Sequence, residues 1–268
     1  MTETVLLVGC GNMGRAMLKG WLAARPSLSA YVVEPSAALR DQAAALGAKA
    51  VGAAPELPAG LAPDLVFLAV KPQVMPQVLP DYAHLANATF VSIAAGTTVA
   101  TLRAGLGQGT PVIRCMPNTP AAIGAGMMVC FATDGVGAAA RDLTTTLLAA
   151  SGEVAWIDDE ALMDAVTAVS GSGPAYVFHL IETLGEAGMA AGLPADLAAR
   201  LAAQTVMGAG RLAMECDTPP GTLREQVTSP GGTTAAALAV MMKEGRMQAM
   251  MTEAVEAARA RGEELGKG

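Results

Sequence analysis

The chain has 268 residues, of which 52% are apolar and 15% are charged, so it can bury a large aliphatic core and is not a disordered protein. Its formal charge of -7, with no two Lys or Arg residues adjacent, argues against a nucleic-acid partner and favours small molecules. No apolar stretch reaches the ~18 residues that span a bilayer, and the first residues lack the basic start of a signal peptide, so we expect a cytoplasmic protein without membrane contacts.

The first 157 residues alternate short runs of high β propensity with Ala/Leu-rich segments. Parallel strands joined by crossover helices give this order. Several of the runs are apolar at consecutive positions, as in strands that helices cover on both faces. We therefore predict an α/β domain over residues 1–157, built on a doubly wound and mainly parallel sheet. Its expected strands are Val5–Val8, Tyr31–Val33, Leu65–Ala69, Phe90–Ala94, Val112–Met116 and Val154–Ile157.

A glycine motif follows the first expected strand and precedes a helix-forming run. The motif is Gly9-Cys10-Gly11-Asn12-Met13-Gly14. G-x-G-x-x-G between a strand and a helix is typical of dinucleotide binding: Gly9 permits the tight turn, Gly11 lets the backbone approach a pyrophosphate, and Gly14 allows close helix packing. The free N–H groups of the helix start add a partial positive charge. The alternative is a glycine-rich turn with a purely structural role.

Glu34 ends the second expected strand, twenty residues after Gly14. An acidic residue at this place accepts the ribose hydroxyls of NAD and repels the 2′-phosphate of NADP. No Arg precedes Arg40 in the following turn to receive that phosphate. We therefore expect NADH to be preferred, with NADPH as the second cofactor. The alternative is that Glu34 is only a solvated strand end.

From residue 158 the β-type runs stop, and the rest of the chain has helical composition. We predict a second, all-helical domain over residues 158–268. Its segment Ala175–Ala191 is apolar around most of the helix circumference and needs burial on nearly all sides. A subunit interface would supply that burial, which predicts a homodimer; the alternative is the central helix of a monomeric bundle.

Few residues are available for nucleophilic or metal chemistry. Four cysteines are scattered without a C-x-x-C pair, which predicts reduced thiols. His179 falls in the apolar helix and is expected to be a core histidine, and His84 lies on a surface-type segment. We expect no metal site.

A second glycine motif opens a helix near the C-terminus. Ser229-Pro230-Gly231-Gly232-Thr233-Thr234 precedes the Ala-rich run Ala235–Met242. Unpaired backbone N–H groups at such a helix start can hold an anion. No Lys or Arg lies within the next eight residues, so a carboxylate suits it better than a phosphate. The alternative is a plain helix cap at Thr233 or Thr234.

Five motifs together resemble those of the pyrroline-5-carboxylate reductases, in order over essentially the whole chain. They are Val66-Phe67-Leu68-Ala69-Val70-Lys71-Pro72-Gln73, Ser92-Ile93-Ala94-Ala95-Gly96, Arg114-Cys115-Met116-Pro117-Asn118-Thr119-Pro120, Ser170-Gly171-Ser172-Gly173-Pro174-Ala175-Tyr176, and Val227-Thr228-Ser229-Pro230-Gly231-Gly232-Thr233-Thr234. The last is the most diagnostic. Two positions depart from the usual pattern, Gln226 and the stretch around Pro55-Glu56, and both bear on the choice between NAD and NADP.

The resemblance implies a Rossmann-like cofactor domain followed by a helical dimerisation and substrate domain. Residues just past the strand ends would form the floor under the cofactor, with Lys71 beside the nicotinamide ribose and Asn118 bonded to the ribose or carboxamide. These floor residues are Ala69, Val70, Lys71, Pro72, Ala94, Ala95, Gly96 and Asn118. For Lys71 the alternative is an exposed lysine at the edge of the sheet.

The resemblance also implies the substrate contacts. The backbone amides of Ser229, Gly231, Gly232 and Thr233 would hold the substrate carboxylate, together with that of Thr234, whose hydroxyl reaches the ring amine. Ser172 is expected to line the pocket. Glu160 matches a family position near the substrate ring nitrogen, and the alternative is an ordinary acid at a helix start.

The implied reaction is the reduction of 1-pyrroline-5-carboxylate to L-proline by hydride transfer, in homodimers that assemble into rings. A β-hydroxyacid dehydrogenase-like enzyme is one alternative, but it needs a catalytic Lys in the helical domain, and this chain has none between Lys71 and Lys243. The other is a non-catalytic dinucleotide-binding regulator, which the complete Ser229–Thr234 motif disfavours.

Overall fold

The computed structural model describes residues 3–266, which divide into two compact units. The sheet unit comprises the chain up to Gly171 together with the segment from Ala258 onward, and the helical unit comprises Ser172–Ala257. The sequence places the boundary at residue 157, whereas residues 158–171 and the end of the last helix group with the sheet. The chain therefore leaves the sheet unit once and returns to it.

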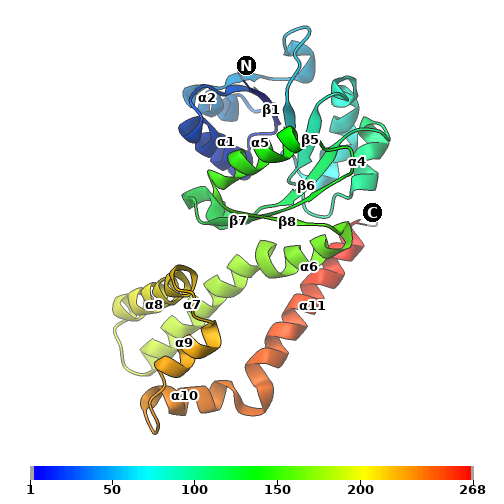
Figure 1. The fold of residues 1–268 in the computed structure, drawn as a ribbon. Coiled ribbons are helices and arrows are strands. Elements are labelled where there is room, and N and C mark those ends of the chain that lie inside the picture. Colours follow the sequence, from blue (N-terminus) through cyan, green and yellow to red (C-terminus); the bar gives the residue numbers. More distant parts are fainter. Residues whose placement is uncertain (1–2, 267–268) are drawn as a thin grey trace. The chain divides into compact units, whose positions relative to one another are not determined.

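The sheet unit contains one sheet with helices packed against it (Figure 1). Its eight strands have the order β3-β2-β1-β4-β5-β6-β7-β8. All neighbours pair in parallel except β6 and β7, which are antiparallel. This confirms the doubly wound, mainly parallel sheet. The strands are β1 Thr4–Val8, β2 Ser29–Val33, β3 Lys49–Val51, β4 Leu65–Leu68, β5 Thr89–Ser92, β6 Val112–Met116, β7 Gly126–Ala132 and β8 Gly152–Ile157.

Two of these strands, β3 and β7, were not expected. β3 has three residues and begins with Lys49 at the edge of the sheet, so it lacks the apolar run that marks the other strands. β7 has such a run but opens on Gly126 and follows the short 3-10 helix η4 (Thr119–Ile123), so its sequence suggests a continuing loop. β8 pairs with β7 and therefore runs antiparallel to β1–β6.

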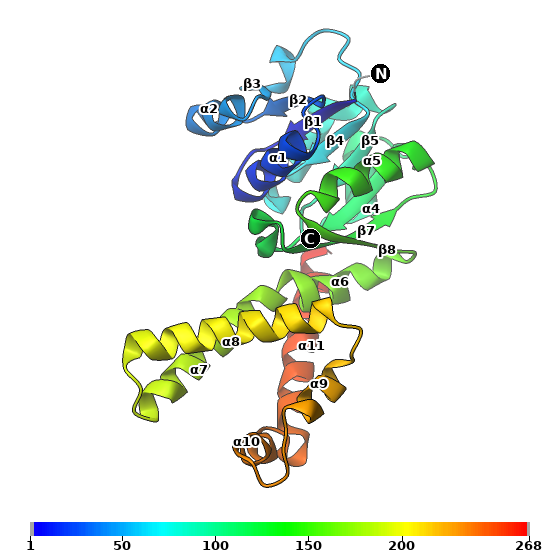
Figure 2. The same ribbon diagram turned by 60° about the vertical axis from the view of Figure 1, so that its left-hand side comes forward.

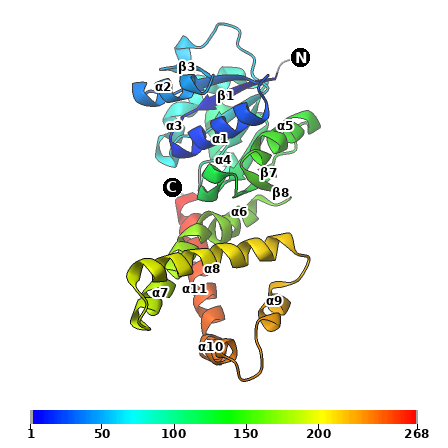
Figure 3. The same cartoon turned by 90° about the vertical axis from the view of Figure 1, so that its left-hand side faces the viewer.

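Helices cover both faces of the sheet and enclose two apolar clusters. The helices α1 (Asn12–Ala24) and α5 (Ala138–Ala149) lie on one face (Figure 3). They bury side chains that include Trp21, whose ring centroid lies 4.4 Å from that of Phe67 on β4. The other cluster lies under α3 (Met75–Val78), η3 (Leu79–Leu85) and α4 (Val99–Leu106). The remaining sheet-unit elements are α2 (Ala37–Ala45), η1 (Ala54–Glu56) and η2 (Pro72–Val74).

Residues 160–171, at the start of the predicted helical domain, form three short helical segments. These are η5 (Glu160–Leu162), α6 (Met163–Val166) and a π-helical turn, η6 (Thr167–Gly171). A π turn inserts one residue into the helix repeat and often marks a functional position. Here it lies where the chain passes into the helical unit.

The helical unit contains α7 (Gly173–Ala190), α8 (Ala195–Glu215), α9 (Pro220–Gln226), α10 (Thr233–Met241), η7 (Lys243–Gly245) and the first part of α11 (Arg246–Gly266). Helices α7 and α8 lie along each other (Figure 2). In α7 the only buried residue is Gly185, while Val177, Phe178, Leu180 and Leu184 are exposed. One copy of the chain thus leaves the apolar surface of α7 uncovered.

The expectation that His179 is a core histidine is wrong for the single chain. Its side chain is 72% exposed, and Nδ1 lies 3.0 Å from a carboxylate oxygen of Glu182, one turn further along α7. The prediction assumed that the apolar residues of α7 are buried, whereas a single copy of the chain leaves them exposed. Within residues 3–266, no helix has the length and apolar character needed to cross a membrane.

Candidate active site

The glycine loop after β1 is closed on one side and open on the other. Gly9 has φ +88°, and a Cβ there would lie 2.9 Å from the carbonyl oxygen of Ala69, so both conformation and space require glycine. A Cβ on Gly14 would lie 2.6 Å from the Gly9 carbonyl oxygen. A Cβ on Gly11, by contrast, would meet nothing within 4 Å. The loop therefore packs against β4 and keeps open space at Gly11.

The start of α1 is suited to an anion at that open side. Gly11 is the N-cap residue, no side chain caps the helix, and its first turn, which includes Asn12 and Met13, has no acidic residue. Its free N–H groups and the helix dipole favour a negative group. The residues present thus fit the pyrophosphate of a dinucleotide.

Glu34 is fixed beside this loop rather than left in solvent. It follows β2, is 8% exposed, and accepts hydrogen bonds from the backbone N–H of Cys10 (2.7 Å to Oε2) and of Ser36 (3.0 Å to Oε1). The nearby Arg40 donates from Nη1 to the carbonyl oxygens of Glu34 (3.0 Å) and Pro35 (2.6 Å). A solvated strand end is therefore excluded, because the carboxylate ties β2 to the glycine loop.

Burial of the loop affects its thiol. Cys10 is fully buried, and burial, reinforced by the negative charge of Glu34, raises its pKa from 9.0 to about 11. The thiol is therefore neutral at physiological pH. Cys10 acts here as a small apolar side chain under the loop.

The next strand ends carry the other expected cofactor residues to the same edge of the sheet. Because β1, β4 and β5 are parallel neighbours, the segments Ala69–Pro72 and Ala94–Gly96 both follow carboxyl ends beside the glycine loop. Lys71 is exposed there. Gly96 has a further neighbour, since a Cβ on it would lie 3.3 Å from Cβ of Leu265, near the end of α11. The last turn of α11 supports the loop.

Asn118 follows β6 and is held by protein atoms on both sides of its amide. Its Nδ2 donates to the carbonyl oxygen of Ser170 (3.2 Å), and its Oδ1 accepts from the backbone N–H of Met127 on β7 (2.9 Å). These bonds connect β6, β7 and the π turn η6. A contact between Asn118 and the cofactor stays a prediction.

Glu160 likewise has protein partners in the sheet unit. Its Oε1 accepts from Nη1 of Arg114 (2.6 Å) and from the backbone N–H of Val99 (2.8 Å), the first residue of α4. The side chain of Arg114, on β6, is 8% exposed, and that of Glu160 is 31% exposed. The pair joins β6 and the start of α4 just after the Ala94–Gly96 loop. The expected substrate contact of Glu160 is untested by these bonds.

The helical unit carries the remaining expected residues. Ser229–Gly232 forms a turn in which the N–H of Gly232 donates to the Ser229 carbonyl oxygen (3.0 Å), and Gly232 is the N-cap of α10. No side chain caps this helix, so its first N–H groups, from Thr233 and Thr234, have no such partner. Ser172 is the N-cap residue of α7.

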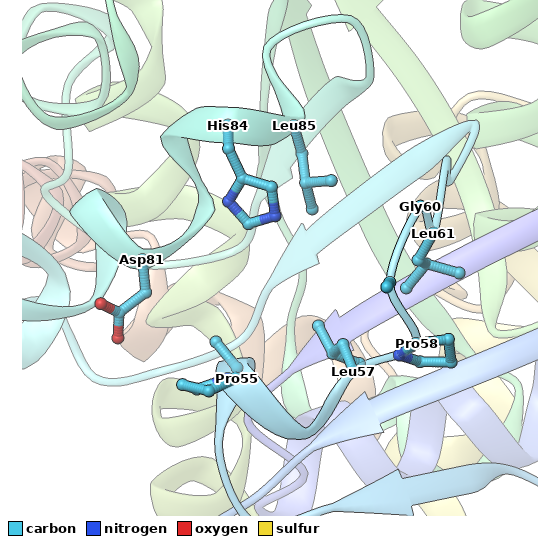
Figure 4. A pocket seen from close by; sticks show the side chains of 10 residues that line it. Pro55, Leu57, Pro58, Gly60, Leu61, Asp81, His84 and Leu85 are labelled. Atoms are coloured by element: carbon cyan, nitrogen blue, oxygen red, sulfur yellow. The ribbon is translucent and has the colours of Figure 1, made fainter.

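Two cavities of the sheet unit lie away from the expected residues. One, of about 610 Å³, is lined by the loop after β3 and by Asp81, His84 and Leu85 of η3 (Figure 4). Another, of about 670 Å³, adjoins the residues that precede β4, β5 and β6. Both lie near the amino ends of the parallel strands. Ligands of doubly wound sheets bind beyond the carboxyl ends.

Comparison with known proteins identifies the family. A model described as pyrroline-5-carboxylate reductase dimerisation matches residues 160–265, and one described as NADP oxidoreductase coenzyme F420-dependent matches residues 4–96. The pyrroline-5-carboxylate reductase of Pseudomonas aeruginosa is 40% identical over 99% of this chain and 98% of its own length. The chain belongs to the pyrroline-5-carboxylate reductases.

Solved structures of this family agree with the fold. The pyrroline-5-carboxylate reductase of Coxiella burnetii is 33% identical, with a TM-score of 0.93 over 100% of both chains. The pyrroline carboxylate reductase of Plasmodium falciparum, solved with NADP bound, is 28% identical, with a TM-score of 0.84 over 98% of each chain.

Family membership establishes the activity. The chain is an oxidoreductase that uses a nicotinamide cofactor to reduce 1-pyrroline-5-carboxylate to L-proline, the last step of proline biosynthesis. The dimerisation domain makes it a homodimer or a larger homo-oligomer. The β-hydroxyacid dehydrogenase-like enzyme and the non-catalytic regulator are thereby set aside.

The sequence did not predict the residues that contact and position the candidate site residues. Arg114, Ser170 and Leu265 hold Glu160, Asn118 and the Gly96 loop, respectively. Arg114 carried a usable signal, because a charged residue inside an apolar strand needs a buried partner. Leu265 carried none, since the return of α11 to the sheet unit is a tertiary feature.

Proposed function

We propose that the chain reduces 1-pyrroline-5-carboxylate with NADH in preference to NADPH, and that Glu34 sets this preference. The supporting observation is the fixed carboxylate: two backbone N–H groups hold its two oxygens at the end of β2. An oriented carboxylate suits the two hydroxyls of an adenosine ribose, which donate to it. A 2′-phosphate would bring a second negative charge to the same place.

In its present position, Arg40 does not offset the repulsion between the Glu34 carboxylate and a 2′-phosphate. Its Nη1 is engaged by the carbonyl oxygens of Glu34 and Pro35. A carboxylate beside a phosphate in partly solvated surroundings costs about 1–3 kcal/mol, which is roughly five- to a hundredfold in specificity. The Plasmodium relative was solved with NADP bound, which is a finding on that protein. The preference of this chain between NADH and NADPH is tested directly below.

The test compares kcat/KM for NADH and NADPH in the native protein and in Glu34→Gln. The amide keeps an acceptor oxygen for the Cys10 or Ser36 N–H group and removes the charge, so we expect the ratio to move toward NADPH. Glu153→Gln is the control for an acid remote from the ribose, because Glu153 is exposed on β8, at the opposite edge of the sheet from β3 and β2. A native preference for NADPH, or an unchanged ratio in Glu34→Gln, would refute the role of Glu34.

For the reaction itself we propose a division of tasks between the two motif groups. The reduced nicotinamide, when bound, supplies the hydride for the imine carbon. The loop Gly9–Gly14 and the segments Ala69–Pro72 and Ala94–Gly96 bind and orient the dinucleotide, with Lys71 and Asn118 at its nicotinamide end. The amides of Ser229–Thr234 hold the substrate carboxylate. Positioning the two reacting carbons provides most of the rate gain.

No side chain in this scheme has to donate a proton, because the imine nitrogen can arrive protonated. The Thr234 hydroxyl then bonds the ring nitrogen, and Ser172 lines the pocket. Thr234→Val should lower kcat/KM by the equivalent of about 1–3 kcal/mol, since it removes one hydroxyl and keeps the branched shape. Thr233→Val is the matched control, because Thr233 is proposed to act through its backbone N–H. Equal kinetics of both variants and the native enzyme would remove Thr234 from the site.

Assembly beyond the dimer is a further proposal. The exposed apolar side chains of α7 and α8, which include Phe178, Leu201 and Met207, support extensive contacts between copies. We expect a dimer at minimum and rings of dimers at higher concentration. Sedimentation velocity over a concentration series distinguishes these states, and monomers alone at micromolar concentration would contradict the proposal.

A further inference from the structure

Cys115 on β6 and Cys130 on β7 lie directly opposite each other in the antiparallel pair of strands. Both side chains are buried in the apolar cluster under α1 and α5, so they project from the same face of the sheet. The two thiols are therefore neighbours across the pair of strands. The mechanism of imine reduction uses neither of them.

The register places this pair at a position without backbone hydrogen bonds between the two residues. The N–H of Thr133 donates to the carbonyl oxygen of Val112 (3.0 Å), which marks Val112 and Thr133 as a bonded pair. Bonded and non-bonded pairs alternate along an antiparallel ladder, so the pair three steps further on, Cys115 and Cys130, is non-bonded. Cα atoms of such pairs are about 4.5 Å apart and their side chains are close, which falls within the about 4.4–6.8 Å of disulfides.

We propose that Cys115 and Cys130 form a reversible cross-strand disulfide when the protein meets a small peroxide. In the first step a sulfur of the pair attacks one peroxide oxygen, the O–O bond breaks, and a sulfenic acid and water result. In the second step the other thiol displaces the sulfenic oxygen, giving the S–S bond and a second water. Two thiols and one hydrogen peroxide thus yield one disulfide and two waters, with two electrons passing from sulfur to oxygen.

The surroundings of the pair determine which oxidant acts and how fast. The neighbouring Cys130 thiol and the burial of the site raise the pKa of Cys115 well above 9.0, so little thiolate forms at neutral pH. The reaction should therefore be slow at pH 7 and faster at pH 9. Burial excludes bulky disulfide oxidants, so we name a small peroxide as the oxidant. Cys10 does not compete, because β4 and β5 separate β1 from β6, roughly 14 Å at ordinary strand spacing.

The link would join two strands that carry residues of the site. Asn118 follows β6 directly, and its amide oxygen accepts from Met127 on β7. A covalent bond between the strands adds to that connection and constrains the unfolded chain. We expect the oxidised protein to melt at a higher temperature than the reduced one.

The test treats the full-length protein with hydrogen peroxide at pH 7 and pH 9, blocks remaining thiols with N-ethylmaleimide in denaturant, and maps peptides by mass spectrometry without reduction. The expected product is a peptide pair joined through Cys115 and Cys130, lighter by two hydrogen atoms, formed faster at pH 9, and reversed by dithiothreitol. Cys130→Ser should give no linked pair, and Cys216→Ser should give the same pair as the native chain. The proposal would be overturned if Cys115 and Cys130 both still reacted with maleimide after peroxide treatment at pH 9 under conditions that fully oxidise Cys216. Such labelling would show that the two thiols had stayed reduced. Sulfinic acid at Cys115 without a link would also overturn the proposal.

Discussion

Replacing Glu160 with alanine tests whether this residue supports the sheet unit. The change removes the acceptor of two hydrogen bonds, one from the Arg114 guanidinium at 2.6 Å and one from the Val99 N–H at 2.8 Å. It leaves the charge of Arg114, whose side chain is 8% exposed, without its carboxylate. We therefore expect the sheet unit to be destabilised and the start of α4 to loosen.

The size of the effect follows from the burial of the two partners. Removing one member of a fully buried pair costs about 3–5 kcal/mol, and a charged hydrogen bond contributes about 1.5–3 kcal/mol. Because the Glu160 side chain is 31% exposed, water can reach part of the site and lowers the cost. We expect Glu160→Ala to lose about 2–3 kcal/mol. Glu160→Gln keeps an acceptor oxygen for both donors and should lose about 1 kcal/mol.

Urea unfolding measured by tryptophan fluorescence is a suitable assay, since both tryptophans, Trp21 and Trp156, lie in the sheet unit. Protein concentration must be fixed because assembly contributes to stability. Asp158→Ala is the matched control, an exposed acid two residues away. An unchanged unfolding midpoint in Glu160→Ala would refute the supporting role. A fall in kcat/KM of Glu160→Gln with unchanged stability would instead favour the substrate contact that the family resemblance implies.

Three further predictions concern the cofactor side of the sheet unit. Gly14→Ala should destabilise the fold by about 1–3 kcal/mol because its Cβ would lie 2.6 Å from a backbone oxygen, whereas Gly11→Ala should leave the melting temperature unchanged and raise KM for NADH, since the added methyl points into open space. The stability that the neutral Cys10 thiol contributes is fully present below pH 9.0 and is lost as pH rises towards 11. The unfolding free energy should therefore fall between pH 9 and pH 11, and it should fall less steeply in Cys10→Ala. Parallel pH profiles of the two proteins would contradict this. Gly96→Ala should raise KM for NADH, because Gly96 has φ +71° and the added Cβ would lie 3.3 Å from Cβ of Leu265 on α11; kinetics identical to the native enzyme would show that this loop does not shape the cofactor site.

Local patterns were sufficient to predict the parallel part of the sheet. The apolar runs of β1, β4, β5 and β6 are bounded by glycine, proline or polar residues, and the strand-turn-helix setting of Gly9–Gly14 fixed the place of the first crossover. The short edge strand β3 was missed because three residues give no period. The run of β7 was missed because only the antiparallel pairing with β6 distinguishes it from a loop.

The candidate site was predictable where a residue acts through its own backbone or type, and not where it acts through a distant partner. The glycines belong to the first group. Glu34 was expected at the ribose, but its bond to the Cys10 N–H depends on how β2 lies beside β1. The bonds of Asn118 to residues 127 and 170 depend on contacts between segments far apart in sequence. Such pairs leave no periodic trace in a single sequence.

The return of α11 to the sheet unit bears on how the protein can be fused to other sequences. Leu265 and Gly266 lie against the Gly96 loop at the carboxyl edge of the strands, whereas β1 begins at Thr4 on the opposite edge. An affinity tag or fluorescent reporter appended after the last residue would start within a few residues of the loop expected under the nicotinamide. The same sequence placed ahead of β1 would join the sheet unit at the opposite edge, where Thr4 lies. Amino-terminal fusions should therefore preserve catalysis better than carboxyl-terminal ones.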